Sequence, residues 1–445
     1  MPRYEIVQSN EFITTHTGSV LVGELLRRTA LPDKLNAVKL TETQSSRISN
    51  AEMVLSYIGV LSQGKPEYAA IEEFRNDRYF AQSLGIKHVP SEASLRQRFD
   101  IIGTQFNDII TNESCKLIKS VGATVTPCYG KHIPLDLDTT PMDNSKTKKE
   151  GVECTYKGFF GFAPMMAYLG KNEGYSVGVE MRTGSTHSQN GTPEFLRKCI
   201  VNSRIITDMP LLVRMDSGND SIDNIKVMQN PKTTADFIIK RNLRKESRKA
   251  YYVMALERGR KLDSNREGKE IYALETVCKP GGIDNDIRMV SIITVRTSTP
   301  CGQLLMEPDI EVESYYTSLF DASAETIVQL YHEHGTMEQF HSEIKTDLDL
   351  ERLPSGKFAT NSLILHLGAL TYNILRLIGQ ESLKTKDFPP TQHSVKRRRI
   401  RTVIQNYITI ASKLVHHARK QWLKFGSINP WYASFRRIYS AFACG

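Results

Sequence analysis

Three acidic residues occupy positions where a folded chain would present them for chemistry: Asp138, Asp216 and Glu338. Asp138 ends a segment of alternating apolar and polar residues, Asp216 directly follows an apolar run, and Glu338 lies in the first turn of an expected helix. Each acid alone is more often a turn former or a helix cap. Three carboxylates within about 5 Å would repel by roughly 3 kcal/mol per pair at an effective dielectric of about 20, so together they would require cations.

The ligand type indicates which cations these would be. Carboxylate oxygens without an accompanying set of His or Cys side chains are typical of Mg²⁺ or Mn²⁺ sites and not of zinc sites. Two such ions about 3.5–4 Å apart can activate a water or a 3′-hydroxyl on one side of a phosphodiester and stabilise the leaving oxygen on the other. We therefore expect two Mg²⁺ ions, which Mn²⁺ could replace, held by the three acids.

The first acid has an alternative. Asp136 and Asp138 lie on the same face of the expected strand, because side chains alternate between the two faces of a strand. Spacing alone leaves both open.

The helix of Glu338 carries a cation on the same face. Ser342 and Lys345 follow Glu338 by four and seven residues, which places all three on one side of a helix. A lysine there could pair with a substrate phosphate near the metals. An exposed face of Glu and Lys without a function would have the same pattern.

Basic charge is concentrated at the end of the chain. The net charge is +9, from 58 Lys and Arg against 49 Asp and Glu, yet residues 381–445 contain 13 of these bases and only 2 of the acids. A segregated basic segment is typical of a protein that binds a polyphosphate such as DNA. The candidate phosphate contacts are Lys396, Arg397, Arg398 and Arg399, and a solvated basic surface is the alternative.

Composition restricts the class of protein. Hydrophobic residues at 40% and charged residues at 24% fit a globular protein. No apolar run without charges approaches the roughly 20 residues of a membrane span, so we expect no membrane partner. The seven cysteines are scattered without a CxxC pair, which favours reduced thiols and a cytoplasmic location.

Hydrophobic periodicity predicts an α/β fold in several parts. Residues 1–125 are expected to form a helical N-terminal domain for DNA binding or dimerisation. Residues 126–242 together with 311–380 are expected to form the catalytic core, and residues 243–310 a β-rich insertion. Residues 381–445 are expected to form a basic helical C-terminal region.

Two segments outside the motifs also have a predicted secondary structure. Residues 250–256 have the composition of a strand of the insertion. Residues near 398–419 are expected to form a basic helix.

Taken together, these motifs resemble those of a known family. Asp138 is followed by Thr-Thr, Asp216 by Ser-Gly, and the third segment has the pattern Tyr331-x2-His334-x3-Glu338-x6-Lys345. The set resembles bacterial insertion-sequence transposases of the DDE class, whose third motif is Tyr-x2-Arg-x3-Glu-x6-Lys. The similarity covers most of residues 90–430.

The resemblance implies a fold and an activity. It implies a ribonuclease-H-like catalytic core with an inserted β-rich domain, and cut-and-paste movement of DNA. The partners would be double-stranded DNA, as terminal inverted repeats and target, and a second copy of the chain in a synaptic complex. The three acids would hold the metals, with Asp138 preferred to Asp136 because of the Thr-Thr after it. Tyr331 and Lys345 would contact the phosphate backbone.

His334 departs from the family pattern, which has Arg at this position. A neutral His lacks the permanent, bidentate charge of an Arg, so a phosphate contact at His334 would depend on pH. Some relatives stack a flipped base on a Trp of the insertion, whereas both tryptophans of this chain, Trp422 and Trp431, lie in the basic region. The route of second-strand cleavage therefore stays open.

Two other classes remain as alternatives. Asp136-x-Asp138-x-Thr140 with Asp216 resembles phosphatases of the haloacid dehalogenase type, in which the first Asp is the nucleophile. That interpretation gives residues 331–345 and the basic region no role. A DNA-binding protein without catalysis is the second alternative, against which the presence of all three acids argues.

Overall fold

The computed structural model describes residues 3–40, 47–283, 285–390 and 395–444. It divides into two compact units. Unit 1 comprises Met1–Ala123, Met142–Val152 and His341–Gly445, and unit 2 comprises Thr124–Pro141 and Glu153–Phe340. Segment 341–380, which we assigned to the catalytic core, clusters with the N-terminal helices in unit 1.

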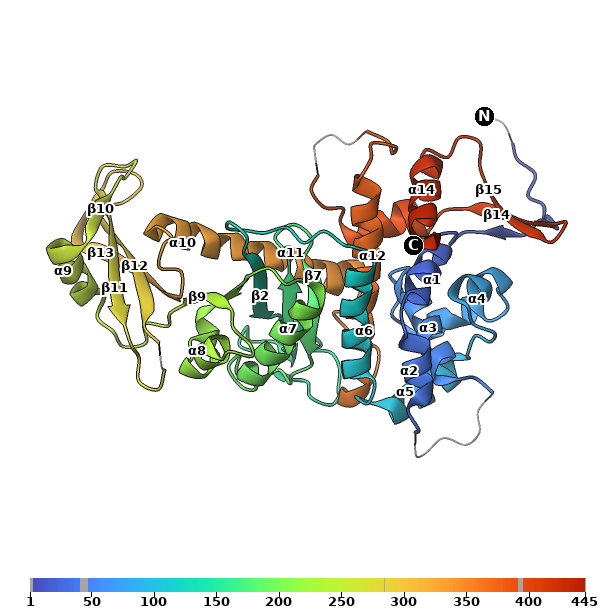
Figure 1. The fold of residues 1–445 in the computed structure, drawn as a ribbon, viewed down its shortest axis with the longest axis horizontal. Helices are drawn as coiled ribbons and strands as arrows, with labels where there is room; N and C mark the ends of the chain where they lie inside the picture. Colours follow the sequence, from blue (N-terminus) through green and yellow to red (C-terminus); the bar gives the residue numbers. More distant parts are fainter. Residues whose placement is uncertain (1–2, 41–46, 284, 391–394, 445) are drawn as a thin grey trace. The chain divides into compact units, whose positions relative to one another are not determined.

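Unit 2 is built on a nine-stranded sheet in the order β10-β11-β12-β13-β9-β8-β2-β6-β7 (Figure 1). β2 (Ile133–Thr139) runs parallel to β8 (Leu211–Met215), which runs parallel to β9 (Asp236–Lys240). β6 (Met165–Leu169) pairs antiparallel with β2, and β7 (Tyr175–Glu180) pairs antiparallel with β6. The sheet is therefore mixed.

Helices cover both faces of this sheet, which explains why β8 is buried along its length. On one face, α10 (Ala324–His332) packs against Leu212 and Ile238. On the other, Gly178 of β7 lies against the side chains of α7 (Thr192–Ile206). The expected combination of helices and strands is confirmed as a mixed α/β architecture around one large mixed sheet.

The predicted β-rich insertion is an extension of the sheet. Its strands β10 (Arg260–Leu262), β11 (Lys269–Cys278), β12 (Ile287–Ser298) and β13 (Leu304–Thr317) pair antiparallel in sequence order. β13 also pairs with β9, so the insertion continues the core sheet without a break in hydrogen bonding.

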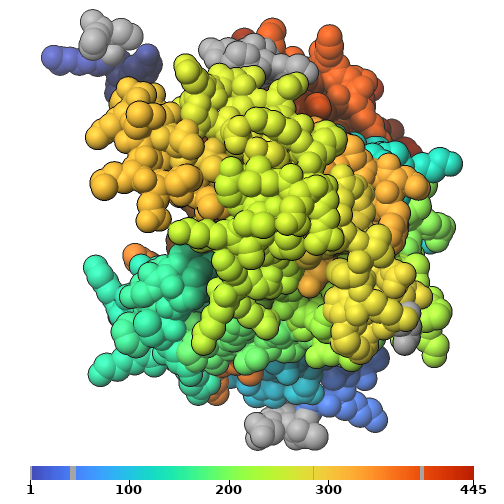
Figure 2. Space-filling model, turned by 90° about the vertical axis from the view of Figure 1, so that its left-hand side faces the viewer, coloured from blue at the N-terminus to red at the C-terminus, as the bar shows by residue number. Residues whose placement is uncertain are grey.

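The strand expected at 250–256 is wrong, because these residues belong to α9 (Arg248–Arg258). Ser247 caps this helix by accepting a hydrogen bond from the amide of Ala250. Tyr251 and Ala255, four residues apart, are buried against Tyr272, Tyr252 and Met254 pack partly against the same cluster, and Val253 faces outward. Figure 2 shows this face of unit 2, with the yellow-green segment that includes α9 in front.

The remaining elements of unit 2 are short. They are β4 (Glu153–Cys154), β5 (Phe160–Phe162), η2 (Ser217–Asn219), α8 (Ile222–Gln229) and η3 (Glu333–Thr336). The helix α11 (Met337–Ser342) begins in unit 2 and ends in unit 1.

Unit 1 is organised around the long helix α12 (Phe358–Leu383), which contacts several N-terminal helices. By length and composition α12 could cross a membrane, but 94% of its apolar window is buried inside the structure, as in the core helix of a soluble protein. The helices before it in the sequence are α1 (Ser19–Arg27), α2 (Leu31–Ala37), α3 (Asn50–Leu61), η1 (Tyr68–Phe74), α4 (Arg78–Leu84), α5 (Glu92–Ile102), α6 (Asn107–Ser120) and η4 (Glu343–Asp347).

The C-terminal region is not entirely helical, so this part of the expected fold class is corrected. α13 (Ile400–Val403) and η5 (Ile404–Ile408) are followed by the antiparallel strands β14 (Ser412–His417) and β15 (Lys420–Phe425). β1 (Ile13–Thr14) pairs with β14, and α14 (Tyr432–Ala443) follows β15. The helix expected near 398–419 therefore ends at Ile408, because the segment after it pairs with β1 and β15 as the strand β14.

Candidate active site

Asp138 and Asp216 occupy neighbouring positions at the ends of two parallel strands. Leu137 pairs with Met215 in the register of β2 and β8, so the next residue on each strand is one of the two acids. Adjacent strands are about 4.8 Å apart. The carboxylates therefore lie together at the carboxyl ends of β2 and β8, where ligands bind in an α/β fold.

The electrostatics of the pair agree with this geometry. Burial and the negative charge of Asp138 raise the pKa of Asp216 above its ordinary value. The Asn219 side chain donates a hydrogen bond of 2.7 Å to Asp216 Oδ1, and the Thr139 amide donates one of 2.7 Å to Asp138 Oδ1. The charge of Asp138 thus disfavours ionisation of Asp216, and two adjacent, partly exposed carboxylates fit the donor set of a divalent cation.

Asp136, the alternative first acid, is paired with an arginine in the core of unit 2. Its two carboxylate oxygens accept hydrogen bonds of 2.6 and 2.7 Å from Arg214, and only 4% of the residue is exposed. Burial alone would raise the pKa of Asp136, but the charge of Arg214 and the nearby His334 hold it below its ordinary value. Arg214 also donates to the carbonyl of Leu330, which ties α10 to the sheet. Asp136 therefore forms a buried ion pair with Arg214 and is not available to a metal ion.

Tyr331 and His334 lie on the face of the sheet that carries the acids. His334 is buried, with Nδ1 3.2 Å from Asp136 Oδ1, and its ring stacks on Tyr331 at 5.9 Å. Burial and the charges of Asp216 and Asp138 raise the pKa of Tyr331. Tyr331 is thus within electrostatic reach of both aspartates, whereas His334 contacts the buried pair beneath them.

Glu338 is the third predicted ligand, and it lies in the first turn of α11 with its side chain exposed. Its neighbours Met337 and Phe340 are buried and anchor that turn. Among the residues that the structure describes, no group of three or more His, Cys, Asp or Glu side chains is arranged to hold a metal ion. The structure therefore brings Asp138 and Asp216 together and does not bring Glu338 into a three-carboxylate group with them.

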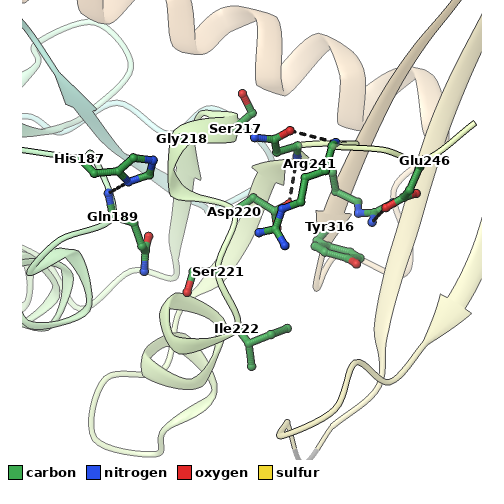
Figure 3. A pocket seen from close by; sticks show the side chains of 12 residues that line it. His187, Gln189, Ser217, Gly218, Asp220, Ser221, Ile222, Arg241, Glu246 and Tyr316 are labelled. Carbon is green, nitrogen blue, oxygen red and sulfur yellow. Dashed lines mark hydrogen bonds and ion pairs between the residues drawn. The ribbon is translucent and has the colours of Figure 1, made fainter. Parts of the chain in front are cut away.

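A cavity of about 620 Å³ opens beside the turn that follows Asp216 (Figure 3). Ser217 and Gly218 of this turn line it, opposite Arg241 and Tyr316. The guanidinium of Arg241 lies 4.7 Å from the centre of the Tyr316 ring and is held by Glu246. The cavity thus offers polar and aromatic groups next to the carboxylate pair.

Tyr156 is a neighbour of the site that the sequence did not indicate. Desolvation and the charges of Asp138 and Asp216 raise the pKa of this tyrosine to about 12. It precedes β5, and no motif or spacing connects it with the acids. Only the folding of the chain brings it there.

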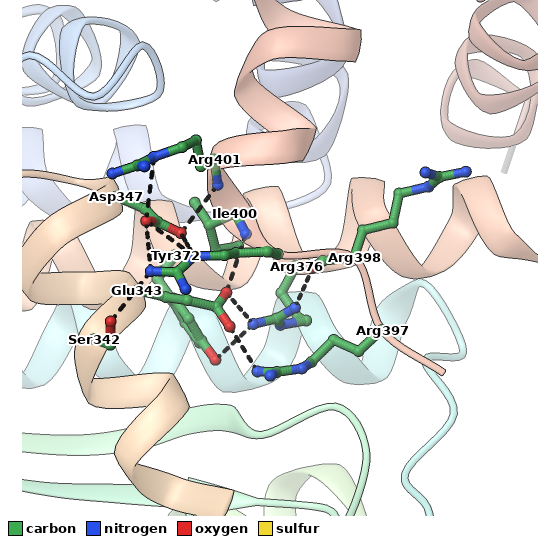
Figure 4. A network of polar contacts seen from close by, with 10 residues as sticks. Ser342, Glu343, Asp347, Tyr372, Arg376, Arg397, Arg398, Ile400 and Arg401 are labelled. Atoms are coloured by element: carbon green, nitrogen blue, oxygen red, sulfur yellow. Dashed lines mark hydrogen bonds and ion pairs between the residues drawn. The ribbon is translucent and has the colours of Figure 1, made fainter. Parts of the chain in front are cut away.

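The other predicted phosphate contacts belong to unit 1. Lys345 lies in η4, with Nζ 3.0 Å from Glu351. Lys396 is exposed. Arg397 contacts the buried Glu343 at 2.7 Å, and Arg399 contacts the buried Asp347 at 2.8 Å (Figure 4).

Arg398 is buried, with 4% exposed, and its guanidinium lies over Phe388 and donates to Ser382. A phosphate could not reach it without rearrangement of unit 1. Much of the charge that the sequence assigned to DNA binding is thus compensated or buried within unit 1.

Comparison with known proteins gives the family. A family model described as "Transposase DDE domain group 1" matches residues 5–443, nearly the whole chain. The chain belongs to this transposase family. The transposase is therefore an enzyme of DNA cleavage and transfer, a class that uses divalent metal ions. This assignment decides against the phosphatase alternative.

Other comparisons are more distant. Over 88% of its length the transposase is similar to 79% of a chain in the cryo-EM structure of the piggyBac transposase synaptic complex with hairpin DNA, at 12% identity and a TM-score of 0.40. A likeness at that TM-score supports no conclusion about this chain. No curated protein matches its sequence.

Proposed function

We propose that the transposase cuts DNA at the ends of its element and joins them to a target, with Asp138, Asp216 and Glu338 as the metal-binding residues. The observation that carries the proposal is the adjacent register of the two aspartates at the ends of parallel strands. The mixed core of β9, β8, β2, β6 and β7 supports a ribonuclease-H-like description of the catalytic part.

Each residue has a definite part in this proposal. Asp138 and Asp216 would hold the cations at the carboxyl ends of β2 and β8. Glu338, exposed at the start of α11, would complete the ligand set when DNA is bound. Two bound Mg²⁺ or Mn²⁺ ions would supply Lewis acidity to the attacking and leaving oxygens. Tyr331, whose phenol stays protonated at neutral pH, can donate a hydrogen bond to a phosphate oxygen near the pair.

The DNA partner would be a duplex carrying the terminal inverted repeats and, in the second stage, a target duplex. Because two ends must be held together for joining, we propose that two copies of the chain act in one complex. This last point rests on the requirement of the reaction.

A cleavage assay with DNA that contains the element's ends tests the proposal. Asp138→Asn, Asp216→Asn and Glu338→Gln should each lower the rate of strand cleavage in Mg²⁺ more than about a thousandfold. Binding of the same DNA in a chelator should persist, because a neutral isostere leaves the fold intact. Glu194→Gln, a change at an exposed acid of α7, is the matched control and should cleave normally.

The outcomes separate the three acids. Cleavage retained by both aspartate variants would overturn the site. Cleavage retained only by Glu338→Gln would remove Glu338 from the ligand set and leave the aspartate pair in place.

A further inference from the structure

The strands β14 and β15 form a basic ribbon in unit 1, and most of its cations make no ion pair with the residues that the structure describes. Ala418 and Arg419 form its two-residue turn, with φ values of 47° and 65°, typical of a tight hairpin between twisted strands. No Asp or Glu occurs in the sequence after Asp387, so the ribbon has no acid of its own.

The two faces of this ribbon differ in chemistry. Cross-strand partners share a face, and the pairs on one face are Lys413 with Lys424, Val415 with Trp422, and His417 with Lys420. The opposite face carries Leu414, Leu423 and Phe425, and Phe425 packs on Phe435 of α14 at 4.9 Å. The apolar face is thus anchored in unit 1, and the other face is basic.

Among the described residues, most cations of the turn and of the basic face lack acidic partners. Lys413 contacts Glu11 of the N-terminal segment. Within the described part of the chain, Arg419, Lys420 and Lys424 make no ion pair, and all three are exposed. Like charges placed close together on a ribbon are destabilising, and a bound polyanion would offset the repulsion among these cations.

The basic segment before the ribbon is in a different situation. Arg397 and Arg399 are bound to Glu343 and Asp347, and Arg398 is buried. Of the two basic segments, therefore, the ribbon offers the more available charge to a polyanion.

We propose that the turn and the basic face of β14–β15 bind the phosphate backbone of duplex DNA through Arg419, Lys420 and Lys424, with Trp422 at the contact. The proposal rests on the proposed function in taking DNA as the ligand. From residue 413 to residue 417 the face extends about 13 Å, at about 3.3 Å per residue, which spans about four phosphates of one strand. A two-stranded ribbon also fits a major groove about 12 Å wide.

The alternative role for such lysines is protection of a free sheet edge. β15 is at the edge of the sheet β1-β14-β15, and lysines on edge strands prevent association with other chains. That role predicts aggregation when the charges are removed and no change in DNA binding.

The salt dependence of DNA binding tests the proposal. Binding of a short fluorescent duplex to the full chain is measured in a chelator, so that no cleavage occurs, over a series of salt concentrations. The triple variant Arg419→Gln, Lys420→Gln, Lys424→Gln should bind more weakly. The slope of the logarithm of its binding constant against the logarithm of the salt concentration should be shallower by up to about 2.7, about 0.9 for each lost phosphate contact.

A control with the same change in net charge is available in unit 2. Arg197, Lys226 and Lys261 are exposed cations, each beside an acid. Their triple change to Gln should leave the slope near that of the wild type. Equal slopes for the wild type and the ribbon variant, or equal effects of the two variants, would overturn the proposal.

Tryptophan fluorescence gives a second readout. Trp422 is 39% exposed on the basic face, and Trp431→Phe leaves it as the single tryptophan. Its emission should change when duplex DNA is added, and an unchanged emission at saturating DNA would contradict the contact. A wild type that does not bind DNA at all would instead refute the proposed function.

Discussion

Asp136 and Asp138 are two positions apart on one face of β2, but their surroundings differ. Asp136 is paired through both oxygens with the buried Arg214, whereas Asp138 reaches the partly exposed edge of the sheet beside Asp216. Buried charges need partners in a low-dielectric interior, and charges that bind cations need access to solvent. The same residue type thus has a structural role at one position and a proposed catalytic role at the other.

This difference predicts that an Asp→Asn substitution affects the free energy of unfolding at one of the two positions and not at the other. Asp136→Asn should lower the free energy of unfolding by about 3–5 kcal/mol, because Arg214 loses its buried counter-charge. Asp138→Asn should leave stability unchanged or slightly higher without metal, since it removes the repulsion with Asp216. Urea denaturation in a chelator measures both. Equal stability of the two variants would contradict the assignment of the buried pair.

At the scale of elements, η4 is fixed by an ionic network. Glu343 is bound by the fully buried Arg376 of α12 and by Arg397, and Asp347 is bound by Arg399 (Figure 4). These contacts join the segment after α11 to α12 and to the start of the basic region, all within unit 1.

Arg397→Gln should therefore act on stability and not on DNA binding. We expect a loss of about 1–3 kcal/mol in the free energy of unfolding, because a hydrogen bond between charged groups is removed from a buried carboxylate. The salt slope of DNA binding should stay at the wild-type value. A flattened slope with normal stability would place Arg397 on a DNA-binding surface, as its sequence position suggests.

The contact between α2 and α6 gives unit 1 a dependence on pH. Burial alone would raise the pKa of Glu113, but hydrogen bonds from Lys34, the Ala30 amide and Lys116 lower it below its ordinary value of 4.5. A carboxyl with a lowered folded pKa contributes stability above its unfolded pKa, and this contribution is lost as the pH falls through the folded value.

Glu113→Gln should accordingly reduce the loss of stability below pH 4.5. Thermal unfolding at a series of pH values measures it, with Glu194→Gln as an exposed control outside unit 1. If the variant and the wild type lose stability in parallel below that pH, Glu113 does not supply this dependence.

At the scale of the whole molecule, the chain passes between the two units four times. Within unit 1 the N-terminal helices share a core with α12: Asn107 bonds to Ser362, and Ser114 bonds to Asn373. Arg28 also donates to the carbonyl of Phe442, near the end of α14. The folding of residues 1–123 thus depends on segments more than two hundred residues away.

A fragment of residues 1–123 should therefore fail to unfold cooperatively. Without α12 its apolar helix faces are exposed, and we expect a low, broad thermal transition and binding of a hydrophobic dye. Circular dichroism and dye fluorescence measure these properties, and co-expression with residues 341–445 should restore part of the transition. A sharp transition of the isolated fragment would show an autonomous domain.

Sequence alone determined the mixed α/β class and the family, because strand periodicity and short motifs around Asp138, Asp216 and Glu338 are local properties of the chain. It could not decide that 250–256 is helical, since a short apolar run fits both a strand and a helix until its packing partners are known. Only the tertiary structure placed Arg214 on Asp136, buried Arg398 and left Arg419, Lys420 and Lys424 of the β14–β15 ribbon exposed. Burial and charge pairing depend on contacts between residues far apart in the chain, which no local pattern records.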